Sequence, residues 1–216
     1  MAEKRNQPEG TKHPRDRGPA PDAELMISIA RRVTEATGQP VVGGVAVILH
    51  GGGRSTYDID IYSDDNWATH LKLSAAGVVW DQVHREHLLD GKAIHLVGPD
   101  SLGGPPKRIS TIQGVKVIGL ADLIRGKLTV GLDVPGRFKD LAHVEDLIAR
   151  IPLGKDFAAK LPTHLRAPFK KLVEGVEHHR AIPAPGTPIK IVKKYSSTPR
   201  ARKRATEMLS SMKKTA

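Results

Sequence analysis

Apolar residues recur at helical spacing between Asp22 and Gly38. Asp22 is suited to a helix N-cap and Gly38 to a helix C-terminus, so the pattern predicts a helix between them. The residues expected on its buried side are Leu25, Ile27, Ile29, Ala30 and Val33. The chain then alternates short β and α patterns, which predict a strand over 40–43, a helix over 45–50, a strand over 57–62 and a helix over 64–76.

The second half continues with strands and ends in helices. Strands are expected over 78–83, 93–97, 109–112 and 115–117, and helices over 120–129, 137–149 and 163–179. A polar turn containing Asp90-Gly91 separates the first two of these strands, and Gln113-Gly114 marks a hairpin. Residues 99–108 have the composition of a loop. This order is typical of an α/β (α+β) protein with a sheet flanked by helices.

The two ends of the chain differ in composition from its middle. Residues 1–21 are rich in proline, glycine and charge and too poor in apolar groups to offset the entropy of ordering, which predicts a disordered leader. We expect the main domain over 22–150 and a helical C-terminal part over 151–180. A Pro-rich linker and a basic tail are expected over 181–216.

The positive charge is concentrated in that tail. The formal net charge is +11, and residues 190–216 hold nine basic residues against one acidic residue, a net charge of +8. The densest run contains Arg200, Arg202, Lys203 and Arg204. A flexible basic segment binds polyanions without reading their sequence, so we expect RNA or DNA as a partner. The alternative is a solvated tail that keeps the protein soluble.

The composition excludes several classes of protein. With no cysteine, the chain has neither a disulfide framework nor thiolate metal sites, which suits a reducing compartment. The longest apolar run, residues 41–49, contains two glycines and is shorter than the roughly 20 residues that span a bilayer. Residues 1–21 contain no apolar stretch. We therefore expect a cytoplasmic protein without a secretory signal or a membrane span.

Asp58 and Asp60 are the first candidates for chemistry. They alternate on the predicted strand over 57–62, so their side chains share one face. Two carboxylates this close repel each other unless a cation lies between them, and Mg²⁺ binds through one or two carboxylates and substrate phosphates. Taken alone, the pair is more typical of a solvated edge strand.

Neighbouring residues favour a nucleotide site. Gly43 and Gly44 lie at a junction from strand to helix, where backbone N–H groups can approach a phosphate. Arg54 supplies a forked, permanently charged donor for phosphate oxygens, and the Ser55 hydroxyl can add a hydrogen bond. Together with the two carboxylates, these residues predict that the chain binds a nucleotide.

Five short elements in order resemble the signature of the polymerase-beta-like nucleotidyltransferase superfamily, and more narrowly its abortive-infection toxin branch. They are Gly43-Gly44, Arg54-Ser55, the strand with Asp58 and Asp60, Lys127, and Lys139-Asp140 near the start of a predicted helix. The resemblance covers about residues 24–150. It implies a nucleotidyltransferase fold, a mixed sheet with flanking helices.

The resemblance also implies an activity and roles for these residues. Asp58 and Asp60 would hold Mg²⁺, Gly43 and Gly44 would cradle the triphosphate, and Arg54, Ser55 and Lys127 would contact phosphates. Asp140 would orient or deprotonate the attacking hydroxyl. The implied reaction moves a nucleotide from a nucleoside triphosphate to a hydroxyl of RNA, including transfer RNA, or of a protein. Membership of that branch implies a bacterial toxin paired with an antitoxin protein.

One departure from the superfamily pattern concerns His95. Many members carry a third carboxylate on a later strand, where this chain has His95 at an inward-facing position of residues 93–97. This argues against two-metal chemistry and leaves three roles for His95: a base, a ligand or a buried hydrogen-bonded side chain. It also supports an alternative function, a catalytically inactive module that binds nucleic acid through its basic tail.

Other residues that can carry chemistry have more ordinary interpretations. His84 and His87 have the spacing of a partial zinc site, but a zinc ion needs further ligands and the chain has no cysteine. Trp67 and Trp80 are too few for a base-stacking platform, so we expect them to pack in the core. Without the resemblance, Lys127 and the Lys139-Asp140 pair are typical of charged helix surfaces.

Overall fold

The computed structural model describes residues 21–181. The helices are α1 (Ala23–Thr37), α2 (Gly43–Leu49), α3 (Asn66–Ala75), α4 (Leu120–Asp133), α5 (Phe138–Arg150) and α6 (Thr163–Ala181), with 3₁₀ turns η1 (Pro99–Leu102) and η2 (Lys155–Lys160). The strands are β1 (Val41–Val42), β2 (Asp58–Tyr62), β3 (Val79–Asp81), β4 (Glu86–Leu89), β5 (Lys92–Val97), β6 (Ile109–Ile112) and β7 (Val115–Ile118). Of the described residues, 21–178 belong to one compact unit.

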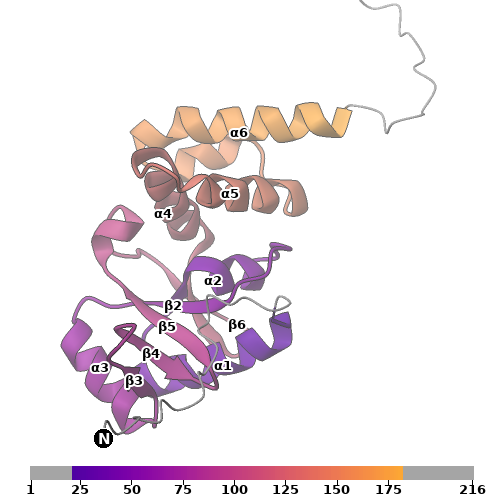
Figure 1. Ribbon diagram of the computed structural model, residues 1–216. Helices are drawn as coiled ribbons and strands as arrows, with labels where there is room; N and C mark the ends of the chain where they lie inside the picture. Colours follow the sequence, from indigo (N-terminus) through magenta and orange to yellow (C-terminus); the bar gives the residue numbers. More distant parts are fainter. Residues whose placement is uncertain (1–20, 182–216) are drawn as a thin grey trace, which may run out of the picture. The chain divides into compact units, whose positions relative to one another are not determined.

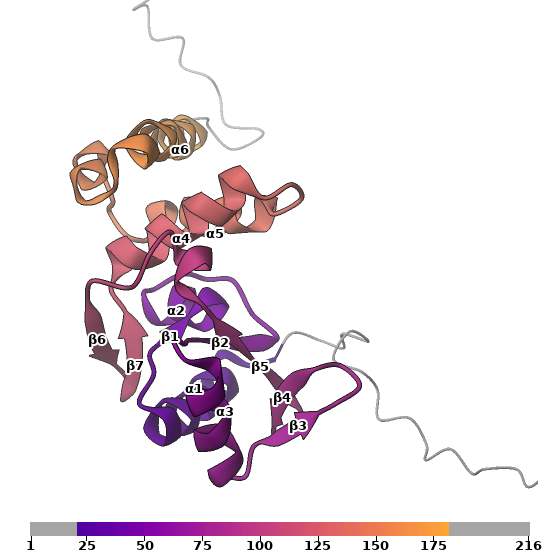
Figure 2. The same cartoon turned by 90° about the vertical axis from the view of Figure 1, so that its left-hand side faces the viewer.

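The seven strands form a single mixed sheet in the order β3-β4-β5-β2-β1-β7-β6. β2 and β5 run parallel at its centre, β1 is antiparallel to β2 and parallel to β7, and the two outer hairpins are antiparallel. Both views place α4, α5 and α6 together at one end of the sheet, away from α1 and α3 (Figures 1 and 2). The predicted fold class, an α/β mixed sheet with flanking helices and a helical C-terminal part, is confirmed.

One hydrophobic core joins the sheet to the helices. Its fully buried side chains include Met26 of α1, Ile59 of β2, Ile94 of β5 and Leu147 of α5. Phe169 of α6 belongs to the same core. Burying large side chains of this kind contributes roughly 1.5–3 kcal/mol each, so the C-terminal helices are held to the sheet by shared packing.

Local sequence signals set several element ends as predicted. Gly38 ends α1 in the left-handed conformation, whereas the Asp22 side chain makes no capping hydrogen bond at the start of this helix. α3 starts two residues later than expected, where the Asp65 side chain accepts a hydrogen bond from the backbone N–H of Ala68. Asp90 and Gly91 have φ of 50° and 70°, which suits a tight hairpin between β4 and β5. Gln113 and Gly114 form the equivalent turn between β6 and β7. Within residues 21–181, no helix has both the length and the apolar character that crossing a bilayer requires.

Other expectations for the elements were wrong. Leu25 is exposed and Met26 is buried in its place, whereas the other four residues predicted on the buried side of α1 are buried as expected. The prediction missed β4 and η2, and it ended α4 four residues early. β4 has the sequence Glu-His-Leu-Leu, which lacks a clear alternation of apolar and polar residues. It is a strand because it pairs with β3 on one side and β5 on the other.

Trp67 and Trp80 do not pack in the core, contrary to expectation. Trp67 is 69% exposed and Trp80 is 40% exposed. Trp67 lies in the first turn of α3, and Trp80 is the middle residue of β3. β3 is an edge strand, so one side of it has no neighbouring strand within the described sheet. The two indoles are therefore surface groups.

Candidate active site

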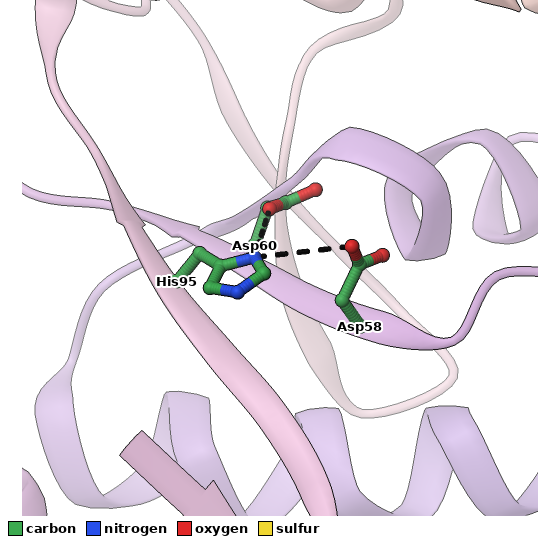
Figure 3. A group of neighbouring side chains, drawn as sticks. All are labelled: Asp58, Asp60 and His95. Atoms are coloured by element: carbon green, nitrogen blue, oxygen red, sulfur yellow. Dashed lines mark ion pairs between the residues drawn. The ribbon is translucent and has the colours of Figure 1, made fainter. Parts of the chain in front are cut away.

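Asp58 and Asp60 lie on one face of β2, and His95 of β5 lies beside them (Figure 3). The parallel register pairs Asp60 with His95 directly. His95 Nδ1 is 3.5 Å from Asp60 Oδ1 and 3.8 Å from Asp58 Oδ2. The sheet thus brings together the two predicted carboxylates and the histidine that replaces the expected third one.

The electrostatics of this group favour a cation. A hydrogen bond to Asp60, the charges of Asp60 and Asp58, and a contact with Glu86 outweigh partial burial and raise the pKa of His95 to about 9. The imidazole is therefore protonated at neutral pH, because the carboxylates around it stabilise positive charge. Asp58 and Asp60 each offer a carboxylate oxygen to a cation, and these oxygens lie within 4.8 Å of each other and of a ring nitrogen of His95.

Gly43 and Gly44 allow the start of α2 to approach the acidic strand. Gly43 has φ of +62°, and a Cβ there would overlap the Asp60 carboxylate. A Cβ on Gly44 would overlap Thr56, whose hydroxyl donates to Asp58 Oδ1 at 2.7 Å. The phosphate cradle that the sequence indicated for these glycines stays a prediction. In the structure, Gly43 leaves the space in which the Asp60 carboxylate lies, and Gly44 leaves the space for Thr56.

A second charged group forms where α4 and α5 meet. Lys127 Nζ donates to Asp140 Oδ1 at 2.7 Å, and Arg137 Nε donates to Asp140 Oδ2 at 2.8 Å. The Asp140 side chain is 1% exposed and that of Lys127 is 10% exposed. Burial raises the pKa of Asp140, but the hydrogen bonds and charges of Lys127 and Arg137 outweigh it and hold this pKa below its usual range.

One cavity of about 610 Å³ connects these two groups. Gly43 and Asp60 line one part of it, and Lys127, Arg137 and Asp140 line another. Asp100 and Ser101 of η1 also line it, and we call this space the charged cavity. Residues more than 60 positions apart in sequence thus face one space, with Asp60 in one part of its wall and the Lys127–Asp140–Arg137 group in another.

The loop that contributes Asp100 and Ser101 is held in place by a buried ion pair that the sequence did not indicate. Asp122 Oδ2 accepts hydrogen bonds from the backbone N–H groups of Lys107 and Arg108. Arg125 pairs with Asp122 at 3.0 Å and donates to the carbonyl oxygens of Leu102, Gly104 and Pro105. Because these bonds satisfy the loop backbone, this wall of the charged cavity is fixed.

Arg54 and Ser55 are exposed and lie on the loop before β2. Among the described residues, the side chains that line the charged cavity do not include them. The loop is anchored to α5, because the Gly53 N–H donates to Asp146 Oδ2 at 2.7 Å. Arg54 is near enough to His143 to contribute to its lowered pKa. The four tail residues Arg200, Arg202, Lys203 and Arg204 lie outside the described residues.

His143 is a further residue of the charged cluster that the sequence did not single out. Burial, followed by the charge of Lys127, lowers its pKa to about 4, although Asp140 opposes the shift. Its Nδ1 is 4.0 Å from Asp140 Oδ1 and has no hydrogen-bond partner among the described residues. In the sequence, this neighbourhood was indicated by the i,i+3 spacing of Asp140 and His143 on the predicted helix. His143 is therefore a neutral, buried neighbour of the ion pairs.

The histidines at 84 and 87 have separate partners. His84 Nδ1 is 2.7 Å from Asp81 Oδ2 at the β3–β4 turn, whereas His87 Nε2 is 2.8 Å from His70 Nδ1 of α3. Asp81, His84 and Glu86 lie close together, which is common for exposed acidic groups without a metal. The two histidines therefore do not converge on one point.

Comparisons with known proteins give similarity of fold only. No protein-family model matches the sequence, and no curated protein matches it. An antigenic nucleotidyltransferase-like protein from Paracoccidioides brasiliensis is similar in structure, with 18% identity, a TM-score of 0.44, and coverage of 76% of this chain and 91% of its own. JHP933 from Helicobacter pylori is similar with 16% identity, a TM-score of 0.43, and coverage of 70% and 76%. We therefore infer function from the geometry of the site.

Proposed function

We propose that this protein is a nucleotidyltransferase that uses Mg²⁺ to move a nucleotide from a nucleoside triphosphate to a hydroxyl of RNA. The observation that carries the proposal is the charged cavity, in which Asp60 of the carboxylate pair shares one space with Lys127, Asp140 and Arg137. Phosphoryl transfer needs positioning and charge stabilisation more than covalent help from the protein. A strand-mounted carboxylate and two cations around one cavity can supply both.

The residues of the carboxylate pair fit a divalent cation. Asp58 and Asp60 provide hard oxygen donors on one face of a rigid strand, and the raised pKa of His95 reflects how strongly the site favours positive charge. Asp58 and Asp60 would hold Mg²⁺. When bound, the ion would neutralise charge that develops on the phosphates during transfer.

Lys127 is the phosphate-binding cation of the proposed site. Its side chain is 10% exposed and lines the charged cavity, so its ammonium group faces the substrate space rather than bulk solvent. A cation held in such a poorly solvated position interacts with phosphate more strongly than one on the surface. Lys127 would stabilise the negative charge of the leaving pyrophosphate.

Asp140 serves as a positioning residue in this proposal. Both of its oxygens accept hydrogen bonds from cations, and its pKa lies below the usual range, so it is a weak base. Of the two roles that the resemblance implied, orientation fits better than deprotonation. Asp140 would hold Lys127 and Arg137 in the directions that suit the triphosphate.

The proposed reaction transfers a nucleotidyl group to the acceptor hydroxyl and releases pyrophosphate. The acceptor hydroxyl oxygen forms a bond to the α-phosphorus of the triphosphate, the bond from that phosphorus to the β-phosphate oxygen breaks, and pyrophosphate leaves. The hydroxyl proton passes to solvent water. Asp58 Oδ1 accepts the Thr56 hydroxyl at 2.7 Å, which keeps this carboxylate in one orientation.

The deciding experiment is nucleotidyl transfer by the purified full chain. The protein is incubated with each radiolabelled nucleoside triphosphate, Mg²⁺ and total RNA, and the products are separated on a gel. We expect label on RNA from the wild type and a loss of at least a thousandfold in the Asp58→Asn/Asp60→Asn double variant. Asp64→Asn is the matched control, because Asp64 is an exposed acid two residues beyond β2.

Each alternative result has a definite meaning. Full activity of the double variant contradicts the assignment of the carboxylates. Label on the protein itself identifies a protein hydroxyl as the acceptor. The toxin role stays a prediction that bacterial growth tests: we expect expression of the wild type to arrest growth and expression of the double variant to leave it unchanged.

One observation favours the alternative, an inactive module that binds nucleic acid. His95 lies 3.5 Å from Asp60 and 3.8 Å from Asp58, so an imidazolium can neutralise the carboxylates without a metal. If the protein is such a module, Mg²⁺ has no effect on nucleotide affinity, and a chain truncated after residue 181 loses its binding to nucleic acid. If the protein is an enzyme, the truncated chain still binds nucleotide in the charged cavity.

A further inference from the structure

A second cavity, of about 700 Å³, lies over α3, β3, β4 and β5. We call it the aromatic cavity, because its wall includes Trp67, His70, Trp80 and His87. His87 pairs in register with Ile94, whereas Asp60 pairs with His95. Successive residues of a strand face opposite sides, so the ring cluster is on the other face of the sheet from the carboxylates. His95 and Glu86, whose Oε2 is 3.4 Å from His95 Nε2, also line this cavity, so one edge of it adjoins the carboxylate group. The proposed transfer gives the four rings no role.

The rings of the aromatic cavity form a continuous cluster. Trp67 stacks on His70 with 5.4 Å between ring centroids and 21° between planes, and Trp80 meets His70 edge-on at 5.6 Å. His87 contacts Trp80 at 4.7 Å and hydrogen-bonds to His70. These contacts among the four rings restrain their orientation. Trp67 nevertheless stays 69% exposed and Trp80 40% exposed. The cavity thus presents pre-positioned aromatic faces to solvent.

The polar groups of the wall favour a ligand that carries both N–H donors and negative charge. Glu86 lines the cavity, and its Oε1 is buried without a hydrogen-bond partner among the described residues. A buried acceptor of this kind is normally satisfied, so a donor from a ligand would complete it. Arg85 lies in the same wall and is exposed, which leaves a cation available for a phosphate.

We propose that the aromatic cavity binds a nucleobase together with its phosphate. A planar base stacks on the exposed indoles, its N–H groups can reach Glu86, and Arg85 contacts the adjoining phosphate. This chemistry belongs both to a free nucleotide and to a base of single-stranded RNA. The indoles lie on the sheet face away from the carboxylates, so a base stacked on them does not lie at the carboxylate pair. The inference does not depend on nucleotidyl transfer.

The protein contains its own reporter for this site. Trp67 and Trp80 are its two tryptophans, so intrinsic tryptophan fluorescence reports on the aromatic cavity alone. We would titrate the full chain with a ten-nucleotide single-stranded RNA, with nucleoside monophosphates, and with inorganic polyphosphate as an anion without bases. We expect quenching by RNA at micromolar and by monophosphates at millimolar concentrations, and none by polyphosphate. Quenching by monophosphates alone would assign the cavity to free nucleotides.

Variants test the same site by a method independent of tryptophan. In the anisotropy of labelled RNA, Trp67→Ala and Trp80→Ala should each weaken binding by about tenfold to a hundredfold, the usual value of one stacked base. Ile109→Ala is the matched control, because Ile109 is 57% exposed on β6, at the opposite edge of the sheet.

Three results would overturn the proposal. One is RNA binding without quenching, with unchanged affinity in both tryptophan variants. Another is quenching by polyphosphate as strong as by RNA. The third is self-association of the wild type in sedimentation that Trp67→Ala abolishes, because the occupant would then be a second copy of the chain.

Discussion

The charged cavity and the aromatic cavity differ in how their side chains are held. In the charged cavity, Lys127 and Arg137 each bind Asp140, which is almost fully buried. In the aromatic cavity, Trp67 and Trp80 are largely exposed and contact mainly other rings. Charges need mutual pairing before they can be taken out of water, whereas aromatic faces tolerate exposure. The first cavity is therefore coupled to the stability of the fold, and the second is not.

The largest expected effect comes from breaking the buried ion pairs. Asp140→Ala leaves Lys127 buried without its carboxylate, so we expect the free energy of unfolding to fall by about 3–5 kcal/mol. Urea unfolding measures this loss. Asp156→Ala, at an exposed acid of η2, is the control. A change below about 1 kcal/mol would show that the pairs do not couple the charged cavity to the fold.

Gly43→Ala should disable the charged cavity by displacing one carboxylate. The new Cβ would overlap Asp60, and φ of +62° is strained for alanine. We expect transfer activity to fall by about a hundredfold, as for a catalytic group displaced by about 1 Å. Gly91→Ala is the control, because φ there is also positive and no atom lies within 4 Å of the added Cβ. Equal activity of the two variants would contradict the proposed contact.

Acid should destabilise the charged cavity through His143. Its pKa is about 4 in the folded chain and about 6.5 in the unfolded chain, so only the unfolded chain binds this proton between these values. The free energy of unfolding thus falls as the pH drops below 6.5, by about 2 kcal/mol at pH 5. Urea unfolding of wild type and His143→Gln at pH 7.5 and pH 5 measures the difference. Identical pH dependence in both proteins would exclude His143 as its source.

The smallest effect on stability should come from the aromatic cavity. Trp67→Ala removes a side chain that is 69% exposed, so we expect the free energy of unfolding to change by less than about 0.5 kcal/mol. Thermal unfolding with the variant and the Ile109→Ala control tests this. A loss above about 1.5 kcal/mol would mean that the indole packs as a structural residue, and the contrast between the two cavities would disappear.

Local sequence chemistry determined most of the fold. The glycine that ends α1, the two hairpin turns with positive φ, and the alternation of apolar residues in β2 each act over a few neighbouring residues. Such signals can be found in one sequence, because the same few residues carry both the cause and the effect. β4 has no such signal, since pairing with β3 and β5 makes it a strand.

For the sites, the sequence determined which residues carry the charges, and the tertiary structure decided which of them meet. Asp58, Asp60, Lys127 and Asp140 could be selected from residue type and spacing. Sheet register was needed to put His95 against Asp60, and packing of α4 on α5 was needed to lock Lys127 onto Asp140. The exposure of Trp67 and Trp80 was mispredicted for the same reason. Burial is a property of the surroundings of a side chain, and those surroundings come from distant parts of the chain.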